Sequence, residues 1–158
     1  MAEITIYTDG SAKGNPGNGG YGAILLSGKF KKELSEGFRN TTNNRMELLS
    51  VIVALEQLKN KPSQVKVYSD SKYVVDAVEK NWVFNWEKKG FAKKKNVDLW
   101  KRFLIIYRQH EVKFIWVKGH AGNPMNERCD QLAVKAAEGD QLLVDEGYEN
   151  KDQPDLLF

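Results

Sequence analysis

The segment from Met46 to Leu58 constrains the fold more than any other part of the chain. Its apolar residues cover nearly the whole circumference of a helix, and a helix that is apolar on most sides must be buried. Short segments rich in β-branched and aromatic residues lie before and after it, which indicates strands. Along the chain the patterns predict three strands, the buried helix, a strand, further helical segments, a fifth strand and a last helix. This order predicts an α/β fold in which a five-stranded mixed sheet is flanked by helices.

The composition is typical of a soluble globular domain, with 41% hydrophobic and 28% charged residues among 158. No apolar run is long enough to cross a bilayer, and no charged and then apolar leader opens the chain, so we expect no membrane partner. Cys129 is the only cysteine, which excludes an intramolecular disulfide and favours a reducing compartment. We therefore expect a cytoplasmic protein, and separately we expect it to be a monomer.

Charge is distributed unevenly along the chain. Residues 80–102 carry eight basic and two acidic side chains, a net charge of +6, whereas residues 138–158 carry seven acids and one lysine, a net charge of −6. We expect residues 1–139 to form the folded domain and residues 140–158 to form a flexible acidic tail.

Four carboxylates lie where the predicted elements meet. Asp9 is expected to end the first strand, Asp70 the fourth strand, Glu47 lies near the start of the buried helix and Asp130 near the start of the last helix. Each has an ordinary alternative: a hairpin turn at Asp9, a capping box for Glu47, a helix cap for Asp70 and a surface acid at Asp130. If strands one and four are neighbours, however, Asp9 and Asp70 lie at adjacent strand ends. Clustered carboxylates repel one another without a cation, and oxygen ligands suit Mg²⁺ or Mn²⁺.

Five collinear motifs resemble those of bacterial type 1 ribonuclease H (ribonuclease HI). They are Tyr7–Ser11 with Gly14–Gly17, Thr41–Glu47, Ser69–Ser71, Asn96–Trp100, and Trp116–Gly122 with Asn126–Asp130. The resemblance implies a ribonuclease H-like fold and Mg²⁺-dependent hydrolysis of the RNA strand of RNA–DNA hybrids, leaving 5′-phosphate and 3′-OH ends. It implies two metal ions held by Asp9, Glu47, Asp70 and Asp130, with His120 assisting catalysis.

The same resemblance predicts the substrate contacts. Asn15, Asn43 and Asn44 are short amides beside the acids that can bind the 2′-OH of RNA, although they are also ordinary turn and cap residues. Lys72 stands where the family commonly has a glutamine-like contact, and its ammonium group suits a phosphate. A basic aromatic segment resembles the family's basic protrusion, for which the alternative is a solvated face. The predicted contacts are Asn15, Thr42, Asn43, Asn44, Lys72, Trp82, Trp86, Lys88, Lys89, Lys93, Lys94 and Lys95.

Two alternative functions and one possible partner follow from the sequence. A module that binds hybrids or double-stranded RNA without cutting is one alternative, and a DNA strand-transfer or junction nuclease of the same superfold is the other. The C-terminal Gln153, Leu156 and Phe158 resemble short motifs that bind the bacterial sliding clamp, whereas docking onto the enzyme itself is the ordinary explanation.

Overall fold

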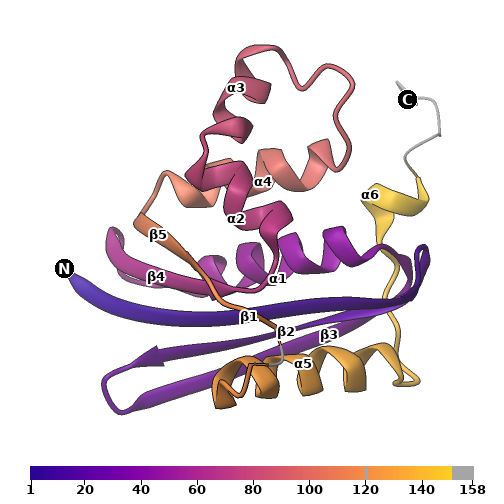
Figure 1. The fold of residues 1–158 in the computed structure, drawn as a ribbon, viewed down its shortest axis with the longest axis horizontal. Helices are drawn as coiled ribbons and strands as arrows, with labels where there is room; N and C mark the ends of the chain where they lie inside the picture. Colours follow the sequence, from indigo (N-terminus) through magenta and orange to yellow (C-terminus); the bar gives the residue numbers. More distant parts are fainter. Residues whose placement is uncertain (120, 151–158) are drawn as a thin grey trace.

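The computed structural model describes residues 1–119 and 121–150, and it contains the predicted five-stranded mixed sheet (Figure 1). The strand order is β3-β2-β1-β4-β5; β1 to β3 are antiparallel, and β4 and β5 run parallel to β1. The strands are β1 (Ala2–Gly14), β2 (Gly17–Ser27), β3 (Phe30–Thr41), β4 (Ser63–Ser69) and β5 (Glu111–Trp116).

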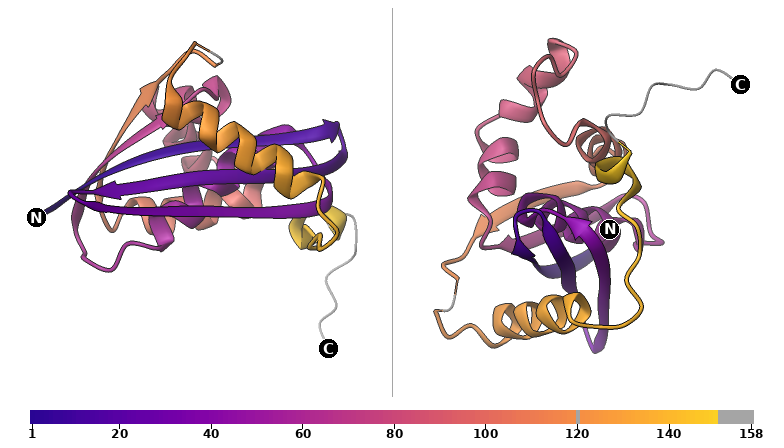
Figure 2. Two further views of the ribbon diagram at one scale, coloured as in Figure 1. Left: turned by 90° about the horizontal axis from the view of Figure 1, so that it is seen from below. Right: turned by 90° about the vertical axis from the view of Figure 1, so that its right-hand side faces the viewer.

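Helices cover both faces of this sheet. Helix α5 packs on β1, β2 and β3 from one side, and α1 to α4 lie on the other (Figures 1 and 2). The helices are α1 (Asn43–Glu56), α2 (Lys72–Glu79), α3 (Trp82–Lys88), α4 (Val97–Tyr107), α5 (Pro124–Ala137) and the short α6 (Glu146–Glu149). Side-chain oxygens of Thr42, Ser71 and Asn123 accept backbone hydrogen bonds at the starts of α1, α2 and α5, so each of these helices begins at a polar cap. None of the described helices is both long and apolar enough to span a membrane.

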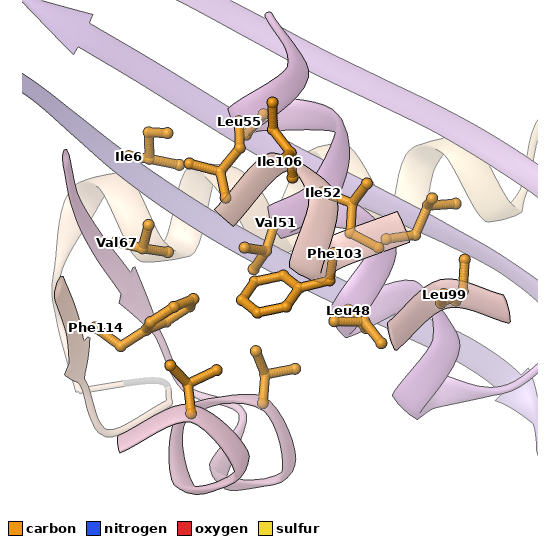
Figure 3. Packing of buried hydrophobic residues seen from close by; sticks show 14 of the residues in the cluster. Ile6, Leu48, Val51, Ile52, Leu55, Val67, Leu99, Phe103, Ile106 and Phe114 are labelled. Carbon is orange, nitrogen blue, oxygen red and sulfur yellow. The ribbon is translucent and has the colours of Figure 1, made fainter. Parts of the chain in front are cut away.

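The all-round apolar character of α1 follows from its position in the core. Helix α1 packs on β1 and β2 with one side and against α4 with another. In Figure 3, Leu48, Val51 and Leu55 of α1 lie among side chains from the sheet and from α4. These neighbours include Ile6, Val67, Phe114, Leu99, Phe103 and Ile106. The predicted buried helix is confirmed.

The first strand differs from the prediction. It does not end at Asp9 but continues to Gly14, and its partner β2 stays paired with it from Thr5 to Gly14. The turn therefore lies at Asn15 and Pro16 rather than at Asp9 and Gly10. What does end near Asp9 is the parallel pairing with β4, whose last pair is Thr8 with Ser69. The glycines after Asp9 indicated a turn, but pairing with β2 overrides that local preference.

Several residues beyond the expected boundary at residue 139 contact the domain. The Leu143 N–H donates to Gly37 O (2.8 Å) and its carbonyl accepts from Arg39 N (2.9 Å), which places this residue beside β3. Asp145 is 7% exposed. Asp145 and Glu149 therefore hold this part of the chain against the domain, because they pair with Arg45 and Arg39, which composition does not reveal. The predicted clamp-binding residues Gln153, Leu156 and Phe158 lie outside the described residues.

Candidate active site

Three carboxylates from three different elements meet at one point of the fold. Asp9 comes from β1, Glu47 from α1, and Asp70 directly follows β4. One ligand oxygen of each lies within 4.8 Å of the others. Asp9 is 5% and Glu47 6% exposed, so the cluster is largely withdrawn from water. The structure thus brings together three of the four predicted metal ligands.

Strand register and close helix packing explain this convergence. Strands β1 and β4 are parallel and paired up to Thr8 and Ser69, so Asp9 and Asp70 are the next residues along each strand. Gly10 packs so closely against the backbone of Met46 and Glu47 that a Cβ atom would collide with it. This close approach brings Glu47 of α1 to the cluster.

The electrostatics of the cluster are unfavourable without a cation. Burial and the neighbouring charge of Asp70 raise the pKa of Asp9 to about 8, although the Gly10 N–H donates to Asp9 Oδ1 (2.9 Å). Burial and the charges of Asp9 and Asp70 raise the pKa of Glu47 well above its ordinary value. Oε2 of Glu47 is buried and accepts no hydrogen bond from the described residues. A buried carboxylate oxygen with unmet bonding capacity, close to two other carboxylates, fits a hard divalent cation such as Mg²⁺.

Asp130 and the loop before α5 border this cluster. Asp130 is half-buried on α5, and its charge contributes to raising the pKa of Asp9, but it is not among the three acids within 4.8 Å. Gly119 approaches Asp70 so closely that a Cβ atom there would lie 2.8 Å from Asp70 Oδ2. His120, the next residue, lies outside the described residues. The catalytic roles of Asp130 and His120 stay predictions.

A family comparison agrees with this geometry, because the RNase H family model matches residues 1–138. The chain belongs to the ribonuclease H family. It is 56% identical to a ribonuclease H of Desulforamulus reducens over 92% of this chain and 94% of the relative. It is 50% identical to ribonuclease HI of Synechocystis over 92% of this chain and 94% of that protein. The resemblance to bacterial type 1 ribonuclease H is confirmed.

Solved ribonuclease H structures share the fold. LC9-RNase H1, described as a type 1 RNase H with the type 2 active-site motif, is 32% identical with a TM-score of 0.81, over 98% of this chain and 82% of that one. LC11-RNase H1, solved in complex with an RNA/DNA hybrid, is 27% identical with a TM-score of 0.66, over 85% of this chain and 96% of that one. The predicted ribonuclease H-like fold is therefore confirmed.

A polar cleft of about 640 Å³ gathers several of the predicted substrate contacts. Asn15, Thr42, Asn44, Lys94 and Lys95 all line it, although they come from three separate segments of the chain. Asn43 lies beside it, since its backbone N–H donates to Asn15 Oδ1 (3.1 Å). The cleft is lined in addition by Arg45, Asn96, Val97, Asp98, Gly147 and Tyr148, none of which was predicted as a contact. The sequence signal for four of them, Arg45, Asn96, Val97 and Asp98, was their position in the family motifs, whereas Gly147 and Tyr148 had none.

The remaining predicted contacts are divided between a second hollow and the open surface. Trp82, Trp86, Lys89 and Lys94 line a hollow of about 230 Å³, where Lys94 Nζ lies 4.9 Å from the centre of the Trp86 ring. Lys88 and Lys93 are exposed and line neither concavity.

Lys72 lies near the carboxylates rather than near these concavities. Its Nζ is 4.8 Å from the centre of the Trp116 ring, whose Nε1–H donates to Asp70 O (3.2 Å). Trp116 is 44% exposed and was not predicted to be near the site. The structure thus places a cation and an aromatic ring beside one of the candidate ligands.

Proposed function

We propose that the chain is an endoribonuclease that hydrolyses the RNA strand of RNA–DNA hybrids and leaves 5′-phosphate and 3′-OH ends. The observation that carries this proposal is the buried cluster of Asp9, Glu47 and Asp70 in a chain of the ribonuclease H family. A module that only binds nucleic acid has no use for three mutually repelling buried acids, so the cluster favours catalysis over binding alone.

Asp9, Glu47 and Asp70 are the residues that would hold two Mg²⁺ ions, with Asp130 completing the set and Mn²⁺ as a substitute. When bound, such ions lower the pKa of water and stabilise the charge that develops on a phosphodiester. The contribution of the chain is to hold the carboxylates close together and largely out of water. His120, in the loop after Gly119, would assist proton transfer and product release.

Recognition of the hybrid is assigned to the polar cleft and to the basic segment. Asn15, Asn43 and Asn44 carry amides at or beside the cleft, where they can both donate to and accept from a 2′-OH group. Lys94 and Lys95 line the cleft and are exposed, so their ammonium groups are available to phosphates. Trp82 and Trp86 offer aromatic surface for a sugar or a base.

The decisive experiment compares an end-labelled RNA–DNA hybrid with all-DNA and all-RNA duplexes, in Mg²⁺ and in EDTA. We expect only the hybrid to be cut, only in its RNA strand and only with the metal. Asp9→Asn should abolish cutting, whereas Asp76→Asn, which changes an acid in a surface pair with Lys80, should not. Cutting of DNA would favour the strand-transfer or junction nuclease, and hybrid binding without cutting would favour the binding module.

Three further expectations belong to this proposal. The protein is expected to be a monomer and to act in the cytoplasm. A sliding-clamp interaction through Gln153, Leu156 and Phe158 stays a prediction, tested by titrating the clamp with the full chain and with a chain that ends at Asn150. Equal binding by the two chains, or none by either, would remove it.

A further inference from the structure

A buried guanidinium lies at the back of the polar cleft. The side chain of Arg45 is 2% exposed, and it forms paired hydrogen bonds with two carboxylates. Nη1 and Nη2 donate to Asp98 Oδ1 (2.9 Å) and Oδ2 (2.7 Å), and Nε and Nη2 donate to Asp145 Oδ2 (2.7 Å) and Oδ1 (2.9 Å). A side chain held by four charge-assisted bonds has one position only.

These bonds join three segments that are far apart in the sequence. Arg45 lies in the first turn of α1, Asp98 in the first turn of α4, and Asp145 directly before α6. Thr41 Oγ1 also donates to Asp145 Oδ2 (2.7 Å), so the end of β3 holds the same carboxylate. Figures 1 and 2 show how the chain leaves α5 on one face of the sheet and reaches α6 on the side of α1 and α4.

The three joined segments are the walls of the polar cleft. Thr42 and Asn44 precede Arg45 at the start of α1, Lys94 to Asn96 precede Asp98, and Gly147 and Tyr148 follow Asp145. Each wall is therefore within a few residues of a group that is bonded to the same guanidinium. A shift of any one of these groups moves the wall that it carries.

We infer that Asp145 is a positioning residue for nucleic-acid binding and that the segment from Asp140 to Asn150 supplies one wall of the substrate cleft, with Tyr148 as its contact. This inference rests on the proposed function, since the ligand is the RNA–DNA hybrid. The charge of Asp145 argues for a positioning role, because a carboxylate beside a polyanion weakens binding through its charge alone. Its benefit must therefore come from the geometry that it imposes on Arg45, Thr41 and Tyr148.

The variant Asp145→Asn separates the effect of the charge of Asp145 from the effect of the geometry that it imposes, because the two change hybrid binding in opposite directions. It removes a negative charge near the cleft, which by itself would lower the KM for the hybrid. It also replaces one accepting oxygen with an NH₂ group that faces the donors of Arg45, which loosens the wall. We expect the KM to rise about tenfold while kcat changes less than twofold, since small misplacements of binding groups are costly. The dissociation constant of the uncut hybrid, measured in EDTA, should rise by the same factor.

Two further variants make the test decisive. Glu56→Gln breaks an ion pair with Arg102 at the surface, and since neither residue lines the polar cleft it should leave both constants unchanged. Tyr148→Ala should raise both the KM and the dissociation constant, and it should lower the urea midpoint less than Asp145→Asn does. If Asp145→Asn does not fold, Tyr148→Ala tests the inference in its place. Unchanged or lower constants for the folded variants would overturn the inference. If the wild-type chain binds the hybrid but does not cut it, the proposed function fails, whereas the binding constants still test the wall.

Discussion

Helix α1 contributes Glu47 to one cluster of carboxylates and Arg45 to another. The repulsion between the carboxylates is handled differently in the two clusters. At Glu47, three carboxylates lie together and burial raises the pKa values of Glu47 and Asp9. At Arg45, two residues earlier, Asp98 and Asp145 surround a guanidinium; burial alone would raise the pKa of Asp98, but the bonds from Arg45 lower it below its ordinary value.

The difference shows how a structural ionic centre can be distinguished from a ligand site. Buried charges persist only when they are paired or when they bind an ion. Where the chain supplies its own cation, the carboxylates stabilise the native arrangement. Where it does not, the acids cost stability that the rest of the fold offsets, which is typical of a functional site. The following experiments break or sharpen this contrast.

The largest effect is expected from removing one charge of the Glu47 centre. Asp9→Asn should lower turnover by about three orders of magnitude or more, because the metal loses a ligand, and at the same time it should raise the thermal midpoint in EDTA because repulsion is relieved. The loss of activity is measured as turnover at saturating Mg²⁺, and the gain in stability is measured by thermal unfolding in EDTA. Asp130→Asn should be milder in turnover. Near-normal turnover by Asp9→Asn would refute the metal-site assignment.

Removing the cation of the other centre should have the opposite effect on stability. Arg45→Met leaves Asp98 and the buried Asp145 without their partner, so the free energy of unfolding should fall by about 3–5 kcal/mol. Urea denaturation measures this loss. The matched variant Arg102→Met breaks the exposed pair with Glu56 and should cost less than about 1 kcal/mol. Equal losses of unfolding free energy in the two variants would show that Arg45 stabilises the fold no more than an exposed ion pair does.

The contrast also predicts how stability depends on pH in the absence of metal. The pKa of Asp9 is raised from an ordinary value of 3.8 to about 8. Between these two pH values, Asp9 keeps its proton in the folded protein but has released it in the unfolded chain. Stability in EDTA should therefore be greatest below about pH 4 as far as this group is concerned, and should fall as pH rises toward about 8.

Urea denaturation of the wild type and of Asp9→Asn at several pH values isolates this contribution. The difference in stability between the two should grow with pH over this range in EDTA. Saturating Mg²⁺ should restore stability to the wild type and much less to the variant, because the ion binds the folded site. A difference that does not change with pH would contradict the raised pKa.

The smallest effect concerns exposed cations, which face solvent rather than a buried acid. Replacing Lys94 and Lys95 with Met should flatten the dependence of log K for hybrid binding on log salt by about one unit for each lysine that contacts a phosphate. The control replaces Lys29 and Lys59, which are exposed and line neither the polar cleft nor the tryptophan hollow, and makes the same change in net charge. If both double variants have the same slope, the lysines of the cleft act only through the net charge.

Local patterns in the sequence were sufficient for much of the fold and for the centre of the site. The apolar circumference of residues 46–58 indicates a helix buried between two layers, because no other position hides all its sides. The strand patterns that flank this helix, with a parallel crossover between them, predict that Asp9 and Asp70 are neighbours. These inferences succeed because periodicity and strand pairing are repeated over many residues.

Only the tertiary structure decided where β1 turns and where Asp145 and Glu149 of the acidic segment lie. The glycines after Asp9 favour a turn locally, but hydrogen bonding to β2 keeps the strand extended to Gly14. Arg45 and Asp145 are both residues that local rules place in solvent, and they are 100 positions apart in the chain. Each is buried because the other neutralises it, and a pairing between two distant single residues leaves no periodic trace in the sequence.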